Sequence, residues 1–83
     1  MIYKIVAIRD RAIDTFGQPA FTASIGGAIR SFGDEIKRVD ENNQLNKHPE
    51  DFDLYDLGTY DDGTGQFTQD SGPKMIAVGK DYV

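Results

Sequence analysis

One stretch of helical periodicity, between residues 24 and 39, restricts the fold more than any other feature of the sequence. Thr22 or Ser24 is placed to accept the free N–H groups of a first helical turn. The remaining segments lack this period, so the expected helix has to bury its apolar face against strands. That face carries apolar side chains at every third or fourth residue: Ile25, Ile29, Phe32, Ile36 and Val39.

Three glycines lie within this expected helix, at Gly26, Gly27 and Gly33. Each weakens a helix by about 1 kcal/mol relative to alanine, so tertiary packing has to hold it. Close approach to a neighbouring backbone would explain why they are there. On the polar side, Asp34 and Arg38 are four residues apart and are expected to form an ion pair.

The rest of the chain is typical of short strands and turns. Residues 10–21 are expected to form a loop or a loose hairpin arm, Pro49 to begin a single helical turn, and 61–65 to form a hairpin turn at Asp62-Gly63. The sequence therefore predicts an α+β fold, with an antiparallel-rich sheet of about four strands and one helix (about 24–39) packed on one face. The strands are expected at 2–9, which would be central, and at 53–60, 66–69 and 74–80.

The size of the chain limits how it can be stabilised. Its 83 residues suit a single domain, 1–83, and contain no cysteine and one histidine. Disulfides and thiolate metal sites are therefore excluded, and a small core leaves a thin margin of stability. We expect a homo-oligomer, with a two-fold dimer favoured because closed two-fold pairs are the commonest arrangement.

Charge is distributed unevenly along the sequence. The chain has 14 acidic and 9 basic residues, for a net charge of −5, yet residues 1–39 hold six bases against four acids. The acidic balance opposes nonspecific phosphate binding by the molecule as a whole. The first ten residues do not resemble a secretory signal, and no apolar stretch is long enough to span a membrane. We expect a protein of the cytoplasm without a membrane partner.

No catalytic, cofactor or metal motif is recognisable. His48 is the only imidazole, and it precedes Pro49, where capping the next turn is its simplest role. The Gly26-Gly27 pair and "GTG" at 63–65 lack the Lys-Ser/Thr of a phosphate-binding loop. "DDGTG" lacks the alternating carboxylates and the closing Glu of a calcium loop. We therefore expect no enzyme, no cofactor and no metal.

Aromatic and basic side chains in the first half form a candidate nucleic-acid site. Aromatics beside cations are what proteins use to stack on the bases of single strands and neutralise their phosphates. The alternative, that the loop aromatics fold back onto a thin core, stays open. The candidate residues are Arg9, Arg11, Phe16, Phe21, Arg30, Lys37 and Arg38.

The acidic hairpin of residues 53–62 has two interpretations. Its carboxylates could discourage edge-to-edge aggregation of a small open sheet. They could instead dock on a basic surface, because complementary charge raises association rates and specificity. The candidate residues for such partner binding are Asp53, Asp56, Asp61 and Asp62.

The segments "YKIVAIRD", "AIRSF", "HPEDFDLYDLGTYDDGTG" and "PKMIAVG" occur in this order over nearly the whole chain. Together they resemble the small non-structural protein of gokushovirus-type microviruses (Microviridae), which are bacteriophages with single-stranded DNA genomes. The stretch "HPEDFDLY" is the most specific part of this resemblance.

The resemblance implies a viral protein made in the cytoplasm of the infected bacterium and absent from the mature virion. It implies a role in viral single-stranded DNA synthesis during genome replication, by analogy with protein C of the ΦX-type coliphages. From the resemblance and the basic first half, we expect a non-enzymatic, DNA-binding homo-oligomer. The alternative is an acidic adaptor that docks on the replication initiator or a host replication protein.

Overall fold

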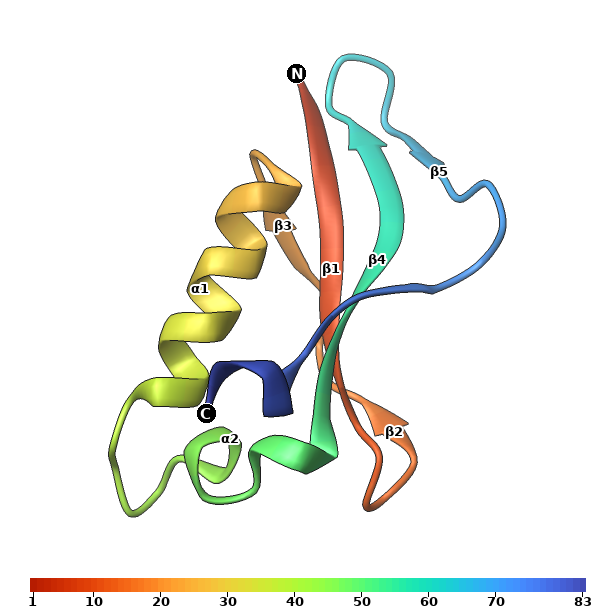
Figure 1. The fold of residues 1–83 in the computed structure, drawn as a ribbon. Coiled ribbons are helices and arrows are strands. Elements are labelled where there is room, and N and C mark those ends of the chain that lie inside the picture. The colour runs from red at the N-terminus through yellow and green to blue at the C-terminus, as the bar shows by residue number, and fades with distance from the viewer.

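The centre of the fold is a long antiparallel pair of strands. The computed structural model describes residues 1–83 and pairs β1 (Ile2–Asp10) with β4 (Phe52–Asp61) along their whole lengths. The register shifts once, between Ile5 and Val6, which indicates a β-bulge. The expected central position of the first strand is confirmed (Figure 1).

Four short strands extend this pair on both sides. On the edge of β1 lie β2 (Thr15–Phe16) and β3 (Ala20–Thr22), and on the edge of β4 lie β5 (Gln66–Thr68) and β6 (Lys74–Val78). All pairs are antiparallel, so the α+β class is confirmed, but the six strands exceed the number expected. The two additional strands lie between residues 15 and 22, largely in the segment expected to be a loop, where runs of two and three residues are too short to show a period.

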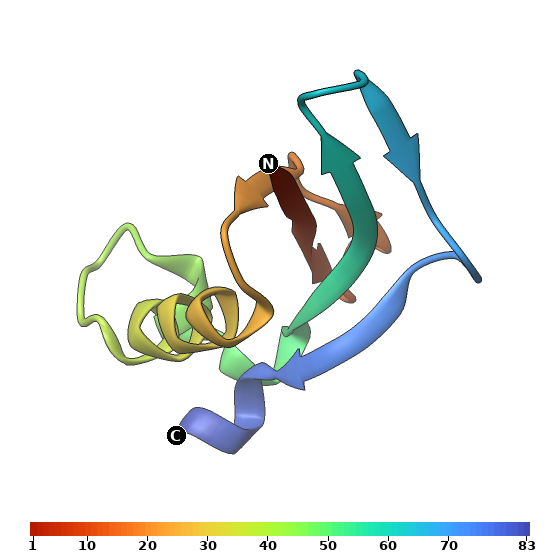
Figure 2. The same cartoon turned by 90° about the horizontal axis from the view of Figure 1, so that it is seen from above.

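The helix α1 (Ile25–Lys37) covers one face of the sheet (Figure 2). Ser24 caps it by accepting a hydrogen bond from the Gly27 N–H, as expected. The core between helix and sheet contains Ala28, Phe32 and Ile36 from α1, and Val6, Phe52 and Leu54 from β1 and β4.

Two details of the expected helix are wrong. Val39 is 87% exposed, because the helix ends two residues earlier and takes this side chain out of the apolar stripe. Arg38 forms ion pairs with Glu35 and Asp40 rather than with Asp34. Arg38 is the C-cap in an extended conformation, so the helical spacing that would bring it to Asp34 does not apply.

Three short helices lie together at one end of the sheet. They are α2 (Gln44–Lys47), η1 (Pro49–Asp51) and η2 (Gly79–Tyr82). The turn at Pro49 is confirmed, α2 was not expected, and the last strand ends at Val78 instead of residue 80. The buried amide of Asn43 donates hydrogen bonds to the carbonyls of Glu35 and Arg38, which ties the end of α1 to α2.

The glycines differ in what they contact. A Cβ on Gly33 would lie 2.8 Å from the ring of Tyr82, whereas one on Gly26 would have no atom within 4 Å. The close approach at Gly33 is to a side chain of η2, and not to a neighbouring backbone as expected. In the hairpin after β4 the positive φ belongs to Gly65, at 73°, and not to Gly63 as expected. None of the helices combines the length and hydrophobicity of a membrane span.

Candidate nucleic-acid interface

The face of the sheet that points away from α1 is lined with aromatic side chains. Alternation along β1 places Val6 and Ile8 toward the helix and Tyr3, Ile5, Ala7 and Arg9 on the other side. Residues directly opposite one another in neighbouring strands share a face, so the register extends this second side across the sheet. We call it the aromatic face; it carries Tyr3, Phe16, Phe21, Tyr55, Tyr60 and Phe67.

Four of these rings form one group, which we call the Tyr60 cluster: Tyr3, Phe21, Tyr60 and Phe67. The ring centroid of Tyr60 lies 4.8 Å from that of Phe67, 5.6 Å from that of Phe21 and 6.5 Å from that of Tyr3. Phe21 is 56% exposed and Phe67 is 65% exposed. The two phenylalanines therefore flank a half-buried tyrosine and leave much of their ring surface open to solvent.

A second group of rings lies at the other end of β1. Phe16 packs edge-on against Tyr55, with ring centroids 5.0 Å apart, and the guanidinium of Arg9 lies 5.7 Å from the centre of the Phe16 ring. The guanidinium also donates a hydrogen bond to Asp14. This bond, with a second one to Tyr55, raises the pKa of Arg9 above its ordinary value. Arg9 is thus a fixed cation beside an aromatic ring.

Arg11 is held differently, by a buried carboxylate. Its Nε lies 3.1 Å from Oδ2 of Asp53, a residue only 2% exposed, and its guanidinium donates to the carbonyl of Glu50. Asp53 also lies directly opposite Arg9 in the β1–β4 register. Arg11 and Asp53 therefore join β1 to the start of β4, and both are occupied within the chain.

The other basic candidates do not lie on the aromatic face. Arg30 and Lys37 are exposed on α1, with the Lys37 ammonium 6.0 Å from the centre of the Tyr82 ring. Arg38 is engaged by Glu35 and Asp40. The structure thus unites Arg9, Phe16 and Phe21 on one face and places the helix cations on another.

The acidic candidates are also dispersed. Asp56 accepts a hydrogen bond from the Gly58 N–H, Asp61 accepts one from the Gly63 N–H, and Asp62 pairs with the terminal ammonium at 2.6 Å. Asp53 is buried with Arg11. Each carboxylate has a partner within the chain, so the four do not form one open acidic surface.

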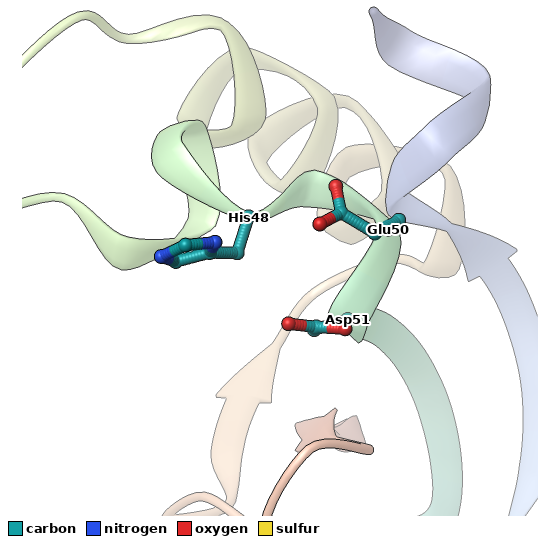
Figure 3. Close-up of side chains that lie close together, drawn as sticks. All are labelled: His48, Glu50 and Asp51. Carbon is teal, nitrogen blue, oxygen red and sulfur yellow. The ribbon is translucent and has the colours of Figure 1, made fainter.

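One group of potential metal ligands is drawn together near η1, at His48, Glu50 and Asp51 (Figure 3). Their ligand atoms lie within 4.8 Å of one another, with His48 and Glu50 exposed and Asp51 half-buried. The His48 side chain makes no capping hydrogen bond to the turn it precedes, contrary to expectation. Exposed groups of this kind are common in acidic proteins, and we assign no metal to them.

Sequence reasoning missed Tyr3, Tyr55, Tyr60 and Phe67 as members of the site. Phe67 is mostly exposed, and Tyr55 and Tyr60 are half-buried outside the core cluster. The alternation of Tyr3, Ile5, Ala7 and Arg9 along β1 was the available signal. It could not show which of the two sides the helix covers.

In the comparison with protein families, residues 3–82 match the family described as Phage ORF5 protein. Comparison with curated proteins and with solved structures found no match. The family match includes every strand and helix except the first residue of β1, and it agrees with the resemblance to a small phage protein. The chain belongs to the phage ORF5 protein family.

Proposed function

We propose that this phage protein binds single-stranded DNA on its aromatic face and thereby acts, without catalysis, in viral single-stranded DNA synthesis in the infected bacterium. The observation that carries the proposal is the aromatic face, a row of partly exposed rings on the side of the sheet without α1. Aromatic rings on an open sheet are stacking platforms for unpaired bases. Membership in a bacteriophage family is consistent with such a ligand.

The arrangement favours single strands over duplexes. Phe21 and Phe67 present open ring surface on either side of Tyr60, and a base can stack there only if its own faces are free. In a duplex those faces are already stacked on neighbouring base pairs. A net charge of −5 further opposes binding to the dense phosphate array of duplex DNA.

Binding through stacking predicts a shallow salt dependence. Among the basic candidates, Arg9 lies on the aromatic face and Arg11 at its end is already paired with Asp53, so few phosphates would be neutralised. For single strands the affinity falls with salt by a log–log slope of about −0.7 per neutralised phosphate. We therefore expect a log–log slope close to that for one or two phosphate contacts, which is much shallower than the slope of a basic DNA-binding protein.

We also propose that the protein acts as a homo-oligomer, with a dimer favoured. The outer edges of β2 and β3, and of β5 and β6, have no further strand, and a second copy can cover them. Light scattering coupled to size exclusion would measure this. A mass near 9.2 kDa at every concentration contradicts the oligomer but leaves DNA binding by the monomer open.

The decisive experiment is a fluorescence titration with labelled oligothymidylate of about ten nucleotides. A duplex of the same length and label is the matched control, and both are measured at about 50 mM and about 200 mM salt. We expect saturable binding of the single strand and much weaker binding of the duplex. Absence of single-strand binding at the lower salt, or equal affinity for the duplex, would contradict the proposal.

A further inference from the structure

Arg9 is positioned to contact a phosphate. Its guanidinium lies over Phe16, and its side chain is 32% exposed at the end of the aromatic face. Arginine binds phosphate and carboxylate through the same planar fork of N–H donors. Because the aromatic ring and the strand register hold the guanidinium in place, little ordering remains to be done when an anion binds.

The Arg9 guanidinium is already paired with an exposed carboxylate. Asp14 lies in the turn between β1 and β2, its side chain is 80% exposed, and its Oδ1 accepts a hydrogen bond from Nη2 of Arg9. Its backbone has a φ of 54°, in the left-handed region that only a few residue types adopt readily. The turn thus brings a solvent-exposed carboxylate onto the Arg9 guanidinium.

We propose that Arg9 forms a phosphate subsite of the aromatic face, and that the Asp14 carboxylate holds the place of the phosphate until DNA binds. The inference rests on the proposed function and adds a specific phosphate contact and an internal competitor to it. A backbone phosphate next to a base stacked on Phe16 replaces Asp14 at the guanidinium. Asp14 then turns outward into solvent, which its exposure permits.

This exchange has a measurable consequence. Breaking an exposed ion pair costs little, so removing the competitor should tighten DNA binding by a factor of about two to five. The log–log salt slope does not separate the two proteins, because Arg9 neutralises one phosphate in both.

The test compares Asp14→Asn with the wild type, using the labelled oligothymidylate. Asparagine has nearly the same shape and tolerates a positive φ, so the turn is retained. Asp34→Asn is the matched control, because it removes the same charge from an exposed site on α1, where Asp34 has no ion pair. Asp14→Gly is a second variant that also suits this φ.

The pairing is tested by repeating the comparison in an Arg9→Gln background, where Asp14→Asn should have no more effect than Asp34→Asn. Tighter binding by both Asp14 variants, lost in that background, supports the subsite. Binding by the wild type with no difference between Asp14→Asn and Asp34→Asn overturns the subsite and leaves the proposed function standing. Absence of binding by the wild type and all variants overturns both.

Discussion

The Nε atom of Arg11 lies 3.1 Å from Oδ2 of Asp53, and the Asp53 side chain is only 3% exposed. The other carboxylate oxygen of Asp53 and the Nε of Arg9 are both buried without a hydrogen-bond partner, on residues that face one another across β1 and β4. The Asp53 carboxylate is thus a buried anion that pairs with Arg11 and lies opposite Arg9 in the register of the central strands. Its role is structural rather than that of a docking surface.

Replacing Asp53 with alanine should therefore destabilise the fold. The change leaves Arg11 without its buried carboxylate, and we expect a loss of about 2–3 kcal/mol, below the usual cost for a fully buried pair because Arg11 is half exposed. Urea unfolding followed by circular dichroism measures it. Asp70→Ala, at an exposed acid, is the control and should change the free energy of unfolding by less than about 0.5 kcal/mol. Equal effects of the two changes would contradict the structural role.

Two glycines of α1 should respond to alanine with opposite signs. Gly26→Ala should stabilise the protein by about 1 kcal/mol, because the added methyl group meets no atom and the helix propensity rises. Gly33→Ala should destabilise it by about 1 kcal/mol or more, because the methyl group would lie 2.8 Å from the Tyr82 ring and displace η2. Thermal unfolding of both variants checks this pair, and a gain at Gly33 would show that Tyr82 is not firmly packed.

Phe67→Ala should weaken single-stranded DNA binding far more than it weakens the fold. Loss of one stacking platform costs about 1–3 kcal/mol of binding free energy, whereas a side chain that is 65% exposed contributes little to the core. The oligothymidylate titration and urea unfolding separate the two effects. Val39→Ala is the control, since Val39 is 87% exposed and lies off the aromatic face. Unchanged DNA affinity of Phe67→Ala would exclude this ring from the interface.

The ion pairs of Arg38 at the end of α1 should make the free energy of unfolding depend on pH. Its hydrogen bond lowers the pKa of Glu35 below its ordinary value, and the pKa of Asp40 is lowered by the Asn42 N–H and then by Arg38. In acid the unfolded chain binds more protons than the folded one at these groups, so stability rises with pH there. The contribution is complete above about pH 4.5 and is lost as the pH falls through the lower folded values.

Comparison of the wild type with Arg38→Gln at about pH 7 and about pH 3 tests this. The variant should have the lower urea midpoint at neutral pH, and the difference should shrink in acid. A difference that stays constant with pH would indicate that Arg38 acts through packing and not through its charge.

The sequence was sufficient for features that depend on neighbouring residues. The helical stripe with its Ser24 cap, the turn begun at Pro49 and the antiparallel α+β class all follow from local periodicity and turn chemistry. The strands β2 and β3 were missed because two or three residues carry no period of their own. They are strands because the edge of β1 offers unpaired N–H and C=O groups that a nearby segment can satisfy.

The tertiary structure alone decided which residues meet. Phe21 and Phe67 reach opposite sides of Tyr60 through the register of four strands, and no spacing along the chain encodes that meeting. It also separated Arg9, beside Phe16, from Arg30 and Lys37 on the helix, although all are basic residues of the same half of the sequence. Periodicity shows that a strand has two sides, but only packing decides which side α1 covers and which carries the partly exposed rings, because burial is a property of the whole assembly of elements.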